Sequence, residues 1–361
     1  MRFRPASWRG SLGWSATSAP VALLLLSGIA VGPQGINLLS EAVLSVLDSV
    51  VPVALAALGV LVGLGAGHHR AGDRYMFAAA CLETAATAIV VAGGTAFVLS
   101  ATIASTSWPV WTLPLAAGLC AATSLTLPTG NPLEPRTAAA RVAELGVLLP
   151  IVAGGPLIAS LREGAPAAGL ILVAQASGVT LVLAAAGWLL LTRASGETEE
   201  RVFAIAVLLL VGGVTDALSV SALLGGLVAG VFWRYAGRLP REAVSRDVLF
   251  VQHPLLVLVL LVAGAHTDLL PLSLGLGGAY AALRVAGTLA GGLMARQAVG
   301  ARVPSDLGLH LLSPGVFGVA FALNAVRAVG SDASILLTMV VIGTIGSELV
   351  ALFLPPQGAG T

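Results

Sequence analysis

The amino-acid sequence predicts an all-α polytopic membrane protein with about twelve transmembrane helices, arranged as inverted repeats with two broken helices that cross. Three observations lead to this prediction: the composition, the spacing of arginines along the chain, and two proline-bearing breaks between or within apolar segments. The chain of 361 residues is 57% hydrophobic and only 10% charged, whereas soluble domains carry about 25% charged residues. A mean hydropathy of +0.97 agrees with a chain that lies largely within lipid.

The same composition excludes several classes of protein. A net charge of +1 offers no basic surface for nucleic acid. Cys81 and Cys120 lie in apolar runs, so we expect small packing residues and not a disulfide or a metal pair. The sequence contains no GxSxG, HExxH, Walker or CxxC motif. We therefore expect no enzyme activity, no cofactor and no bound structural metal.

Twelve apolar segments of spanning length, about 20 residues each, divide the chain. They lie near residues 17–32, 41–66, 74–100, 107–126, 136–160, 166–192, 199–214, 216–235, 245–265, 270–297, 305–328 and 332–355. We expect residues 1–361 to form a single integral membrane domain without a soluble domain. A cleaved signal peptide is not expected, because the first apolar run lacks a convincing small-residue cleavage site.

Arginine supplies all eighteen basic residues and marks alternate loops. Arginines lie before the first segment and after the second, sixth, eighth and tenth: Arg2, Arg4, Arg9, Arg70, Arg74, Arg193, Arg201, Arg234, Arg238, Arg241, Arg246, Arg296 and Arg302. The loops after the first, third, seventh and ninth segments have none. Because positively charged loops stay in the cytoplasm, this alternation predicts an even number of spans and cytoplasmic termini.

The first break lies at residues 123–130, TSLTLPTG, at the end of the fourth apolar segment. Irregular backbone and a proline such as Pro128 survive in a membrane only where protein or a water-filled cavity surrounds them, since unpaired amides are costly in hydrocarbon. The hydroxyl groups of Thr123, Ser124 and Thr126, with the freed carbonyls around them, are therefore candidate oxygen ligands for an ion.

The second break is Ser313-Pro314-Gly315, in the middle of the eleventh segment. Proline removes a backbone donor and clashes with the preceding turn. The fourth and eleventh segments are seven apart, and an odd offset reverses their direction, as an inverted repeat requires. Either break alone is compatible with a simple proline kink, but two breaks at this spacing favour a crossed pair.

Among the charged residues inside apolar segments, Glu144 in the fifth and Arg284 in the tenth are the strongest candidates for a functional role. A carboxylate at mid-membrane costs at least about 2.5 kcal/mol and usually marks an ion or proton path. We predict that Glu144 and Arg284 face each other. The alternative is a static role, as compensation of half-helix dipoles or as a fixed ion pair. Glu83 in the third segment is the alternative acid, either as the partner of Arg284 or on an entry path.

Three other acids are expected to have structural places. Asp48 and Asp216 are predicted near the outer surface, and Glu348 is predicted to pack against a helix end.

Several stretches, taken in order, resemble the monovalent cation:proton antiporter superfamily, and most of all its second branch of bacterial Na+/H+ or K+/H+ exchangers. They are LSGIAVGPQGINLL (26–39), ATSLTLPTG (122–130), AELGVLLP (143–150), LSVSALLGGLVAGVFWR (218–234), HPLLVLVLLVAGAHTDL (253–269) and HLLSPGVFGVAFALNA (310–325). The likeness covers roughly residues 18–355, and the order of the stretches carries it. The family often has Asp-Asp, Asn-Asp or Gln-Asp where this chain has Ala143-Glu144, and we expect its usual first helix to be absent here.

The resemblance implies a core around helices 3–5 and 10–12 that moves against dimerisation helices, in a homodimer in a bacterial inner membrane. It implies exchange of protons for Na+ or K+ by alternating access, with Glu144 as the carrier and Arg284 pairing with the empty carboxylate. Two other functions stay open: a membrane sensor or scaffold without transport, and a transporter of a small organic anion held by Arg284. An intramembrane enzyme is least favoured, since no nucleophile–base pair is visible.

Overall fold

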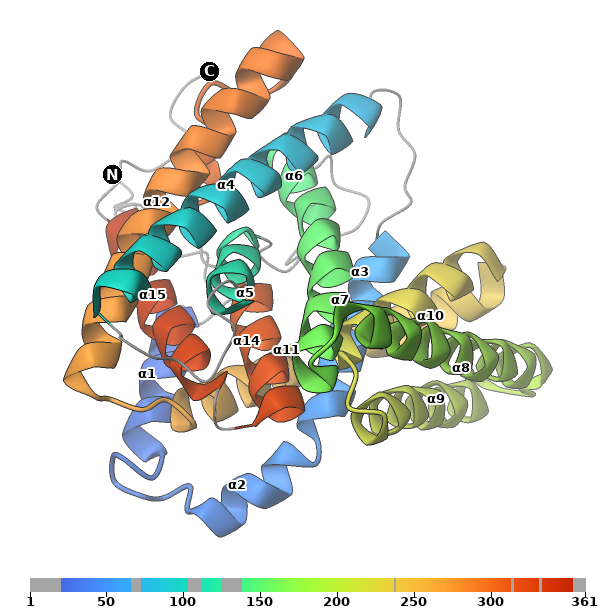
Figure 1. Ribbon diagram of the computed structural model, residues 1–361. Helices are drawn as coiled ribbons and strands as arrows, with labels where there is room; N and C mark the ends of the chain where they lie inside the picture. The colour runs from blue at the N-terminus through green and yellow to red at the C-terminus, as the bar shows by residue number, and fades with distance from the viewer. Residues whose placement is uncertain are drawn as a thin grey trace, which may run out of the picture.

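The structure is a computed structural model that describes residues 21–65, 73–102, 112–124, 138–236, 238–312, 315–330 and 333–352. Within these ranges the regular secondary structure is entirely helical (Figure 1). The helices are α1 (Val21–Val31), α2 (Glu41–Asp48), α3 (Val51–Gly65), α4 (Asp73–Thr102), α5 (Thr112–Ala121), α6 (Ala138–Gly146), α7 (Leu148–Glu163), α8 (Pro166–Arg193), α9 (Glu197–Ala217), α10 (Ala222–Ala236), α11 (Arg238–Ala265), α12 (Pro271–Val299), the 3-10 helix η2 (Gly300–Arg302), α13 (Leu307–His310), α14 (Val316–Val329) and α15 (Ser334–Leu352).

Each of the twelve predicted segments corresponds to one helix or to one pair of helices. The second segment is the pair α2 and α3, bent by 40°, the fifth is α6 and α7, and the eleventh is α13 and α14. Five of the described spans are long and apolar enough to cross a membrane, or up to six if α2 and α3 count as one span. The apolar helices α1, α5, α10 and α14 are shorter, at 10–17 residues. For α5 and α14 the reason is that each adjoins a break.

Local sequence explains several helix ends. α8 and α12 start with Pro166 and Pro271, in the first turn where proline has no hydrogen bond to lose. Gly164 caps the C-terminal end of α7, and its φ of 68° is a left-handed conformation that glycine adopts without a Cβ clash.

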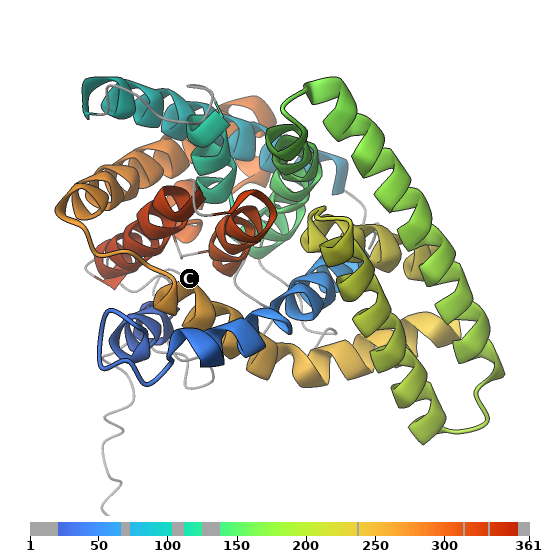
Figure 2. The same cartoon turned by 60° about the horizontal axis from the view of Figure 1, so that its bottom comes forward.

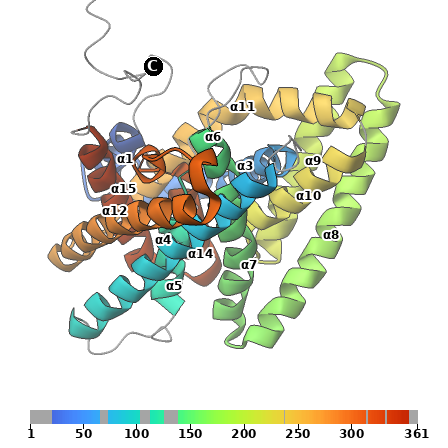
Figure 3. The ribbon, with the colours of Figure 1, turned by 90° about the horizontal axis from the view of Figure 1, so that it is seen from above.

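The helices form two groups. In one group α4 packs along α12, α12 contacts α15, and α5 contacts α4, α7, α14 and α15 (Figures 1 and 3). In the other, α3 packs against α10 and α11, and α8 and α9 form an antiparallel pair at one edge of the molecule (Figure 2). The helices of the first group, α4–α7 and α12–α15, are those predicted as the core. α7 contacts both groups, since it packs on α8 as well as on α14.

Glycine allows the closest of these helix contacts. A Cβ atom on Gly226 would lie 1.9 Å from the carbonyl oxygen of Ala56, and one on Gly230 would lie 2.4 Å from that of Val60. Small residues at this spacing let two membrane helices approach through their backbones. α3 and α10 are therefore held at a separation that no larger side chain would permit.

Candidate functional site

The two interrupted segments touch at their broken ends. α5 ends at Ala121, and α14 starts directly after Gly315. A Cβ atom on Gly315 would lie 2.1 Å from the carbonyl oxygen of Thr123, and one on Gly318 would lie 2.5 Å from that of Cys120. The C-terminal end of α5 therefore lies against the N-terminal end of α14, and the predicted crossing of two broken helices is confirmed.

Four of the residues predicted at the breaks lie outside the described part of the chain. They are Thr126, Pro128, Ser313 and Pro314. Gly315 is described and lies at the crossing. The positions that flank both breaks therefore define the site.

Arg284 of α12 lies at this crossing and is 2% exposed. Its Nε donates to the carbonyl oxygen of Ala121 at 3.3 Å, and its Nη2 donates to that of Thr123 at 3.2 Å. Its Nη1 donates to Ser347 Oγ of α15 at 2.6 Å. The C-terminus of a helix carries about half a negative charge, so this guanidinium compensates the end of α5 and ties it to two other helices.

Glu144 of α6 has a different basic neighbour from the predicted one. Its Oε2 lies 2.9 Å from Nη1 of Arg141, three residues earlier on the same helix. Among the described residues, no ion pair joins Glu144 to Arg284. The physical reason is that the Arg284 guanidinium is directed at the end of α5 and at α15, while the i,i+3 spacing brings Arg141 onto the Glu144 face.

Glu83 of α4 is the most deeply buried acid of this region, at 2% exposed. The Thr87 hydroxyl donates to Glu83 Oε1 at 3.1 Å, and the neighbouring Thr84 hydroxyl donates to the carbonyl oxygen of Gly146 at 3.4 Å. Glu83 and Arg284 attract each other electrostatically across the contact of α4 with α12. The structure thus places the alternative acid in the field of Arg284 and beside the end of α6.

Two of the predicted oxygen ligands are described, and both are buried. Thr123 is 1% exposed and Ser124 is 8% exposed. The Thr123 hydroxyl donates to the carbonyl oxygen of Cys120 at 2.9 Å, while the Thr123 carbonyl accepts from Arg284. Oxygen atoms therefore line the end of α5. No group of three or more His, Cys, Asp or Glu side chains in the described ranges is placed to hold a metal ion.

Sequence reasoning missed three polar neighbours of the site. Arg141 and Thr87 had a usable signal, since each lies three or four residues from an intramembrane acid, Glu144 or Glu83, on the same helix. Ser347 had no such signal, because only the packing of α15 against α12 brings it to Arg284.

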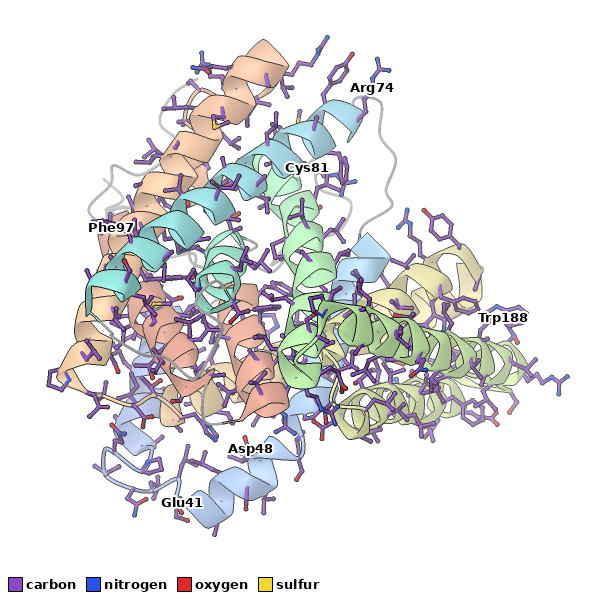
Figure 4. All side chains as sticks on the ribbon, viewed as in Figure 1. Glu41, Asp48, Arg74, Cys81, Phe97 and Trp188 are labelled. Carbon is purple, nitrogen blue, oxygen red and sulfur yellow. The ribbon has the colours of Figure 1, made fainter. Side chains whose placement is uncertain are left out.

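A second charged cluster lies at the ends of four helices. Arg327 of α14 donates to the carbonyl oxygen of Asp48 and, at 2.9 Å, to Oδ1 of Asp216. His266 Nε2, just after α11, lies 3.3 Å from Oδ2 of Asp48. Asp48 is at the junction of α2 with α3 (Figure 4). We name Arg327, Asp48, Asp216 and His266 the edge cluster. The hydrogen bond that His266 makes with Asp48 raises the pKa of His266, although partial burial opposes this shift.

Glu348 was expected to pack against a helix end, and this prediction is confirmed. Its Oε2 accepts a hydrogen bond from the backbone N–H of Ala22, in the first turn of α1, where N–H groups have no partner within the helix.

The fold, but not the sequence, has a described match among known proteins. No family model matches the sequence, and no curated protein matches it. The solved structure of the sodium proton antiporter MjNhaP1 from Methanocaldococcus jannaschii is similar, with a TM-score of 0.66 over 92% of this chain and 91% of that chain, at 17% sequence identity. The chain therefore has the fold of a sodium proton antiporter.

Proposed function

We propose that this chain is a secondary transporter that exchanges protons for a monovalent cation, Na+ or K+, by alternating access. The observation that carries the proposal is the crossing of α5 and α14, with Arg284 buried against the carbonyls at the end of α5. Broken helices at depth supply backbone oxygen to a cation and fixed partial charges to a site. The fold shared with a sodium proton antiporter supports the same function.

Glu144 is the proposed carrier of the proton or the cation. Its side chain is 16% exposed, whereas Glu83 is almost fully buried, so an ion that arrives from water meets Glu144 first. Arg141 holds the carboxylate at 2.9 Å. A proton on Glu144 abolishes this ion pair, and a cation is repelled by the guanidinium, so each ligand must displace Arg141. One carboxylate with two mutually exclusive ligands is what exchange requires.

Thr123, Ser124 and Thr126 are the proposed oxygen ligands of the cation, beside Glu144. The Thr123 hydroxyl uses its proton on Cys120, which leaves its lone pairs directed elsewhere and able to accept. Arg284 acts as the fixed charge of the crossing. In this scheme Glu83 is the alternative acid, and it becomes the carrier only if Glu144 is dispensable.

The proposed setting is a bacterial inner membrane, in which a homodimer keeps its remaining helices fixed while α4–α7 and α12–α15 move. Both termini are proposed to be cytoplasmic. A reporter fused after Thr361 tests this topology, because it is active only in its cytoplasmic form if the arginine alternation sets the orientation.

The test of function is a cation panel in liposomes that contain the purified chain and a pH-sensitive dye. We expect a change in lumenal pH on addition of Na+ or K+, and we expect Glu144→Gln to abolish it without loss of the folded protein. The matched control is Glu163→Gln, which makes the same change at an exposed position at the end of α7 and leaves the flux intact.

Three results would redirect the proposal. Normal cation-coupled flux by a folded Glu144→Gln variant would transfer the carrier role to Glu83. The absence of proton flux with every cation would favour a scaffold or sensor without transport. The pair Ala143-Glu144 leaves that function open, because it lacks a second polar residue at the site. Flux that requires an organic anion and is lost in Arg284→Gln would make Arg284 the substrate-binding group.

A further inference from the structure

The fifth segment is interrupted two residues after Glu144, and Pro150 explains why. α6 ends at Gly146 and α7 begins at Leu148. Pro150 lies in the first turn of α7, and proline has no N–H to donate to the carbonyl four residues earlier, which is that of Gly146. The proline ring also clashes with that carbonyl in a regular helix. The carbonyl of the buried Gly146 is therefore an acceptor without its helical donor.

Thr84 of α4 supplies a donor in its place. The Thr84 side chain is fully buried, and its hydroxyl donates to the carbonyl oxygen of Gly146 at 3.4 Å. The two residues fit closely, because a Cβ atom on Gly146 would lie 2.9 Å from Thr84 Oγ1. A larger residue at position 146 would therefore displace the hydroxyl. A threonine on one helix thus matches a glycine and a proline on another.

The same face of α4 also holds α5. Ala88 comes four residues after Thr84, so the two residues lie one above the other on one side of α4. A Cβ atom on Gly118 of α5 would lie 2.5 Å from the carbonyl oxygen of Ala88, so the backbones of α4 and α5 touch there. α4 therefore contacts α6 and α5 at points that lie about 6 Å apart along its axis, at 1.5 Å per residue. Figure 1 shows α4 passing over both helices.

The proposed ligands of the cation belong to the two helices that α4 holds together. Glu144 lies two residues before Gly146 on α6, while Thr123 and Ser124 follow the end of α5. A cation needs the carboxylate and several oxygen atoms at fixed distances from one another, whereas a proton needs the carboxylate alone. The placement of α6 relative to α5 should therefore change the affinity for the cation much more than the affinity for the proton.

We propose that Thr84 is a positioning residue that sets the preference of Glu144 for the cation over the proton. The Thr84 hydroxyl holds the carbonyl that Pro150 leaves free and so fixes the junction of α6 with α7. Through this junction it fixes the distance from Glu144 to the oxygen atoms at the end of α5. The proposal rests on the proposed function of Glu144 as the carrier. Thr84 acts on the helix that bears the carrier, and not on the ion itself.

Cation-driven proton flux in liposomes that contain the full chain tests the effect on the ion. Thr84→Val keeps the shape of the side chain and removes the donor. We expect it to raise the KM for Na+ or K+ about fivefold, the equivalent of about 1 kcal/mol for one hydrogen bond, and to leave the maximal rate at saturating cation unchanged. Thr84→Ser restores the hydroxyl and should restore the KM. The matched control is Thr180→Val, because Thr180 is equally buried and donates to the Ala176 carbonyl of its own helix.

Two further variants test the cause of the change in KM. Pro150→Ala restores the N–H that can donate to the Gly146 carbonyl within the helix, so Thr84→Val should have little effect on the KM in that background. Gly146→Ala tests the contact from the other side, because its Cβ displaces the Thr84 hydroxyl. It should raise the KM as Thr84→Val does, and it replaces that variant if Thr84→Val does not fold.

Hydrogen exchange of the backbone amides from Val147 to Ile151 tests the junction without transport. These amides close the turns on either side of it, since Val147 N–H donates to Ala143 and Ile151 N–H donates to Val147. We expect Thr84→Val to speed their exchange about fivefold and Thr180→Val to leave it unchanged. Unchanged exchange in a folded Thr84→Val protein overturns the proposal.

The flux measurement can overturn the proposal in three ways. They are a wild-type KM in Thr84→Val, a fall in its maximal rate without a change in KM, and an equal rise in KM in Thr180→Val. Failure of the proposed function looks different, because the wild-type chain then moves no proton with any cation. The exchange measurement still decides in that case whether Thr84 holds the junction.

Discussion

Two of the arginines that hold helix ends differ in their burial, since Arg284 lies in the interior and Arg327 lies in the edge cluster. Arg284 is 2% exposed and donates to two carbonyl oxygens at the end of α5 and to a serine hydroxyl. The Arg327 side chain is 19% exposed and donates to the carbonyl of Asp48 and the carboxylate of Asp216. Both compensate the partial negative charge of a helix C-terminus. Among the described residues, only Arg327 also contacts carboxylates.

The difference shows how burial decides the role of the same side chain. Water can replace part of what Arg327 does, because that cluster is partly exposed and its charge is shared among several groups. Nothing comparable replaces a guanidinium that is withdrawn from water, since a buried charge left without its partner is costly. We infer that the crossing depends on Arg284 much more than the edge cluster depends on Arg327.

The largest expected effect is that of Arg284→Ala. It should lower the free energy of unfolding by about 2–6 kcal/mol, because it leaves the two buried carbonyl oxygens at the end of α5 without their donor, at about 1–3 kcal/mol each. Thermal unfolding of the purified protein in detergent measures this. Arg284→Lys should lose less stability than Arg284→Ala, because it keeps the charge. It should still be less stable than the wild type, because an ammonium group lacks the planar fork that reaches three acceptors. Arg296→Ala, exposed on the same helix, is the control, and equal stability of both alanine variants would contradict the comparison.

The next effect is the energetic coupling of Arg284 to Glu83 and to Glu144. The Glu83→Gln/Arg284→Ala double variant should be more stable than the sum of the single variants predicts, by about 1–3 kcal/mol, as for coupled neighbours. Glu144→Gln with Arg284→Ala should be additive within about 0.5 kcal/mol, because Arg141 and not Arg284 contacts Glu144. Recovery of stability in the second double variant instead of the first would favour the fixed Glu144–Arg284 pair.

Part of this arrangement could be predicted from the sequence, and part of it could not. The twelve segments and the two breaks were predictable, because apolar length and proline position depend on local sequence. Their inverted spacing predicted that α5 and α14 cross. The contact of Arg284 with the end of α5 corresponds to dipole compensation, one of the two alternatives that the sequence left open.

The sequence could not predict the contacts between side chains of different helices. Ser347 reaches Arg284 only through the packing of α15 on α12, and no spacing along the chain encodes that distance. The Arg141–Glu144 pair is different, because its i,i+3 spacing favours a local charge over a more distant one and could have predicted it. The edge cluster joins four helix ends through tertiary packing, so its acids were predictable only as surface residues.

A smaller effect is expected for Arg327→Gln. The variant loses a charge-assisted hydrogen bond to Asp216 in a partly exposed place, so stability should fall by about 1–2 kcal/mol. The stability of Asp216→Asn should fall by less, because Arg327 still donates to the Asp48 carbonyl in that variant. Thermal unfolding under the conditions used for Arg284→Ala gives a direct comparison. A loss as large as that of Arg284→Ala would mean that exposure does not separate the two arginines.

The smallest effect is a pH dependence at the C-terminal end of α11, where His266 lies in the edge cluster. The hydrogen bond to Asp48 raises the pKa of His266 above its usual value, while burial and the charge of Arg327 oppose the shift. A histidine whose pKa is higher in the folded state stabilises fully below its unfolded pKa of about 6.5. That contribution disappears as the pH rises through the folded pKa. The wild-type chain should therefore lose up to about 1 kcal/mol relative to His266→Gln between about pH 5.5 and 8.5.

Melting temperatures of the wild type and His266→Gln across that range measure the effect. The groups facing His266 are Asp48 from α2 and Arg327 from α14, with Asp216 held on Arg327. Asp48→Asn should remove the same pH dependence, because the imidazolium then has no carboxylate in contact. His253→Gln, at an exposed position of α11, should keep the wild-type profile. A gain of wild-type stability on raising the pH would reverse the expected sign, and it would mean that desolvation of His266, and not its bond to Asp48, dominates at the edge cluster.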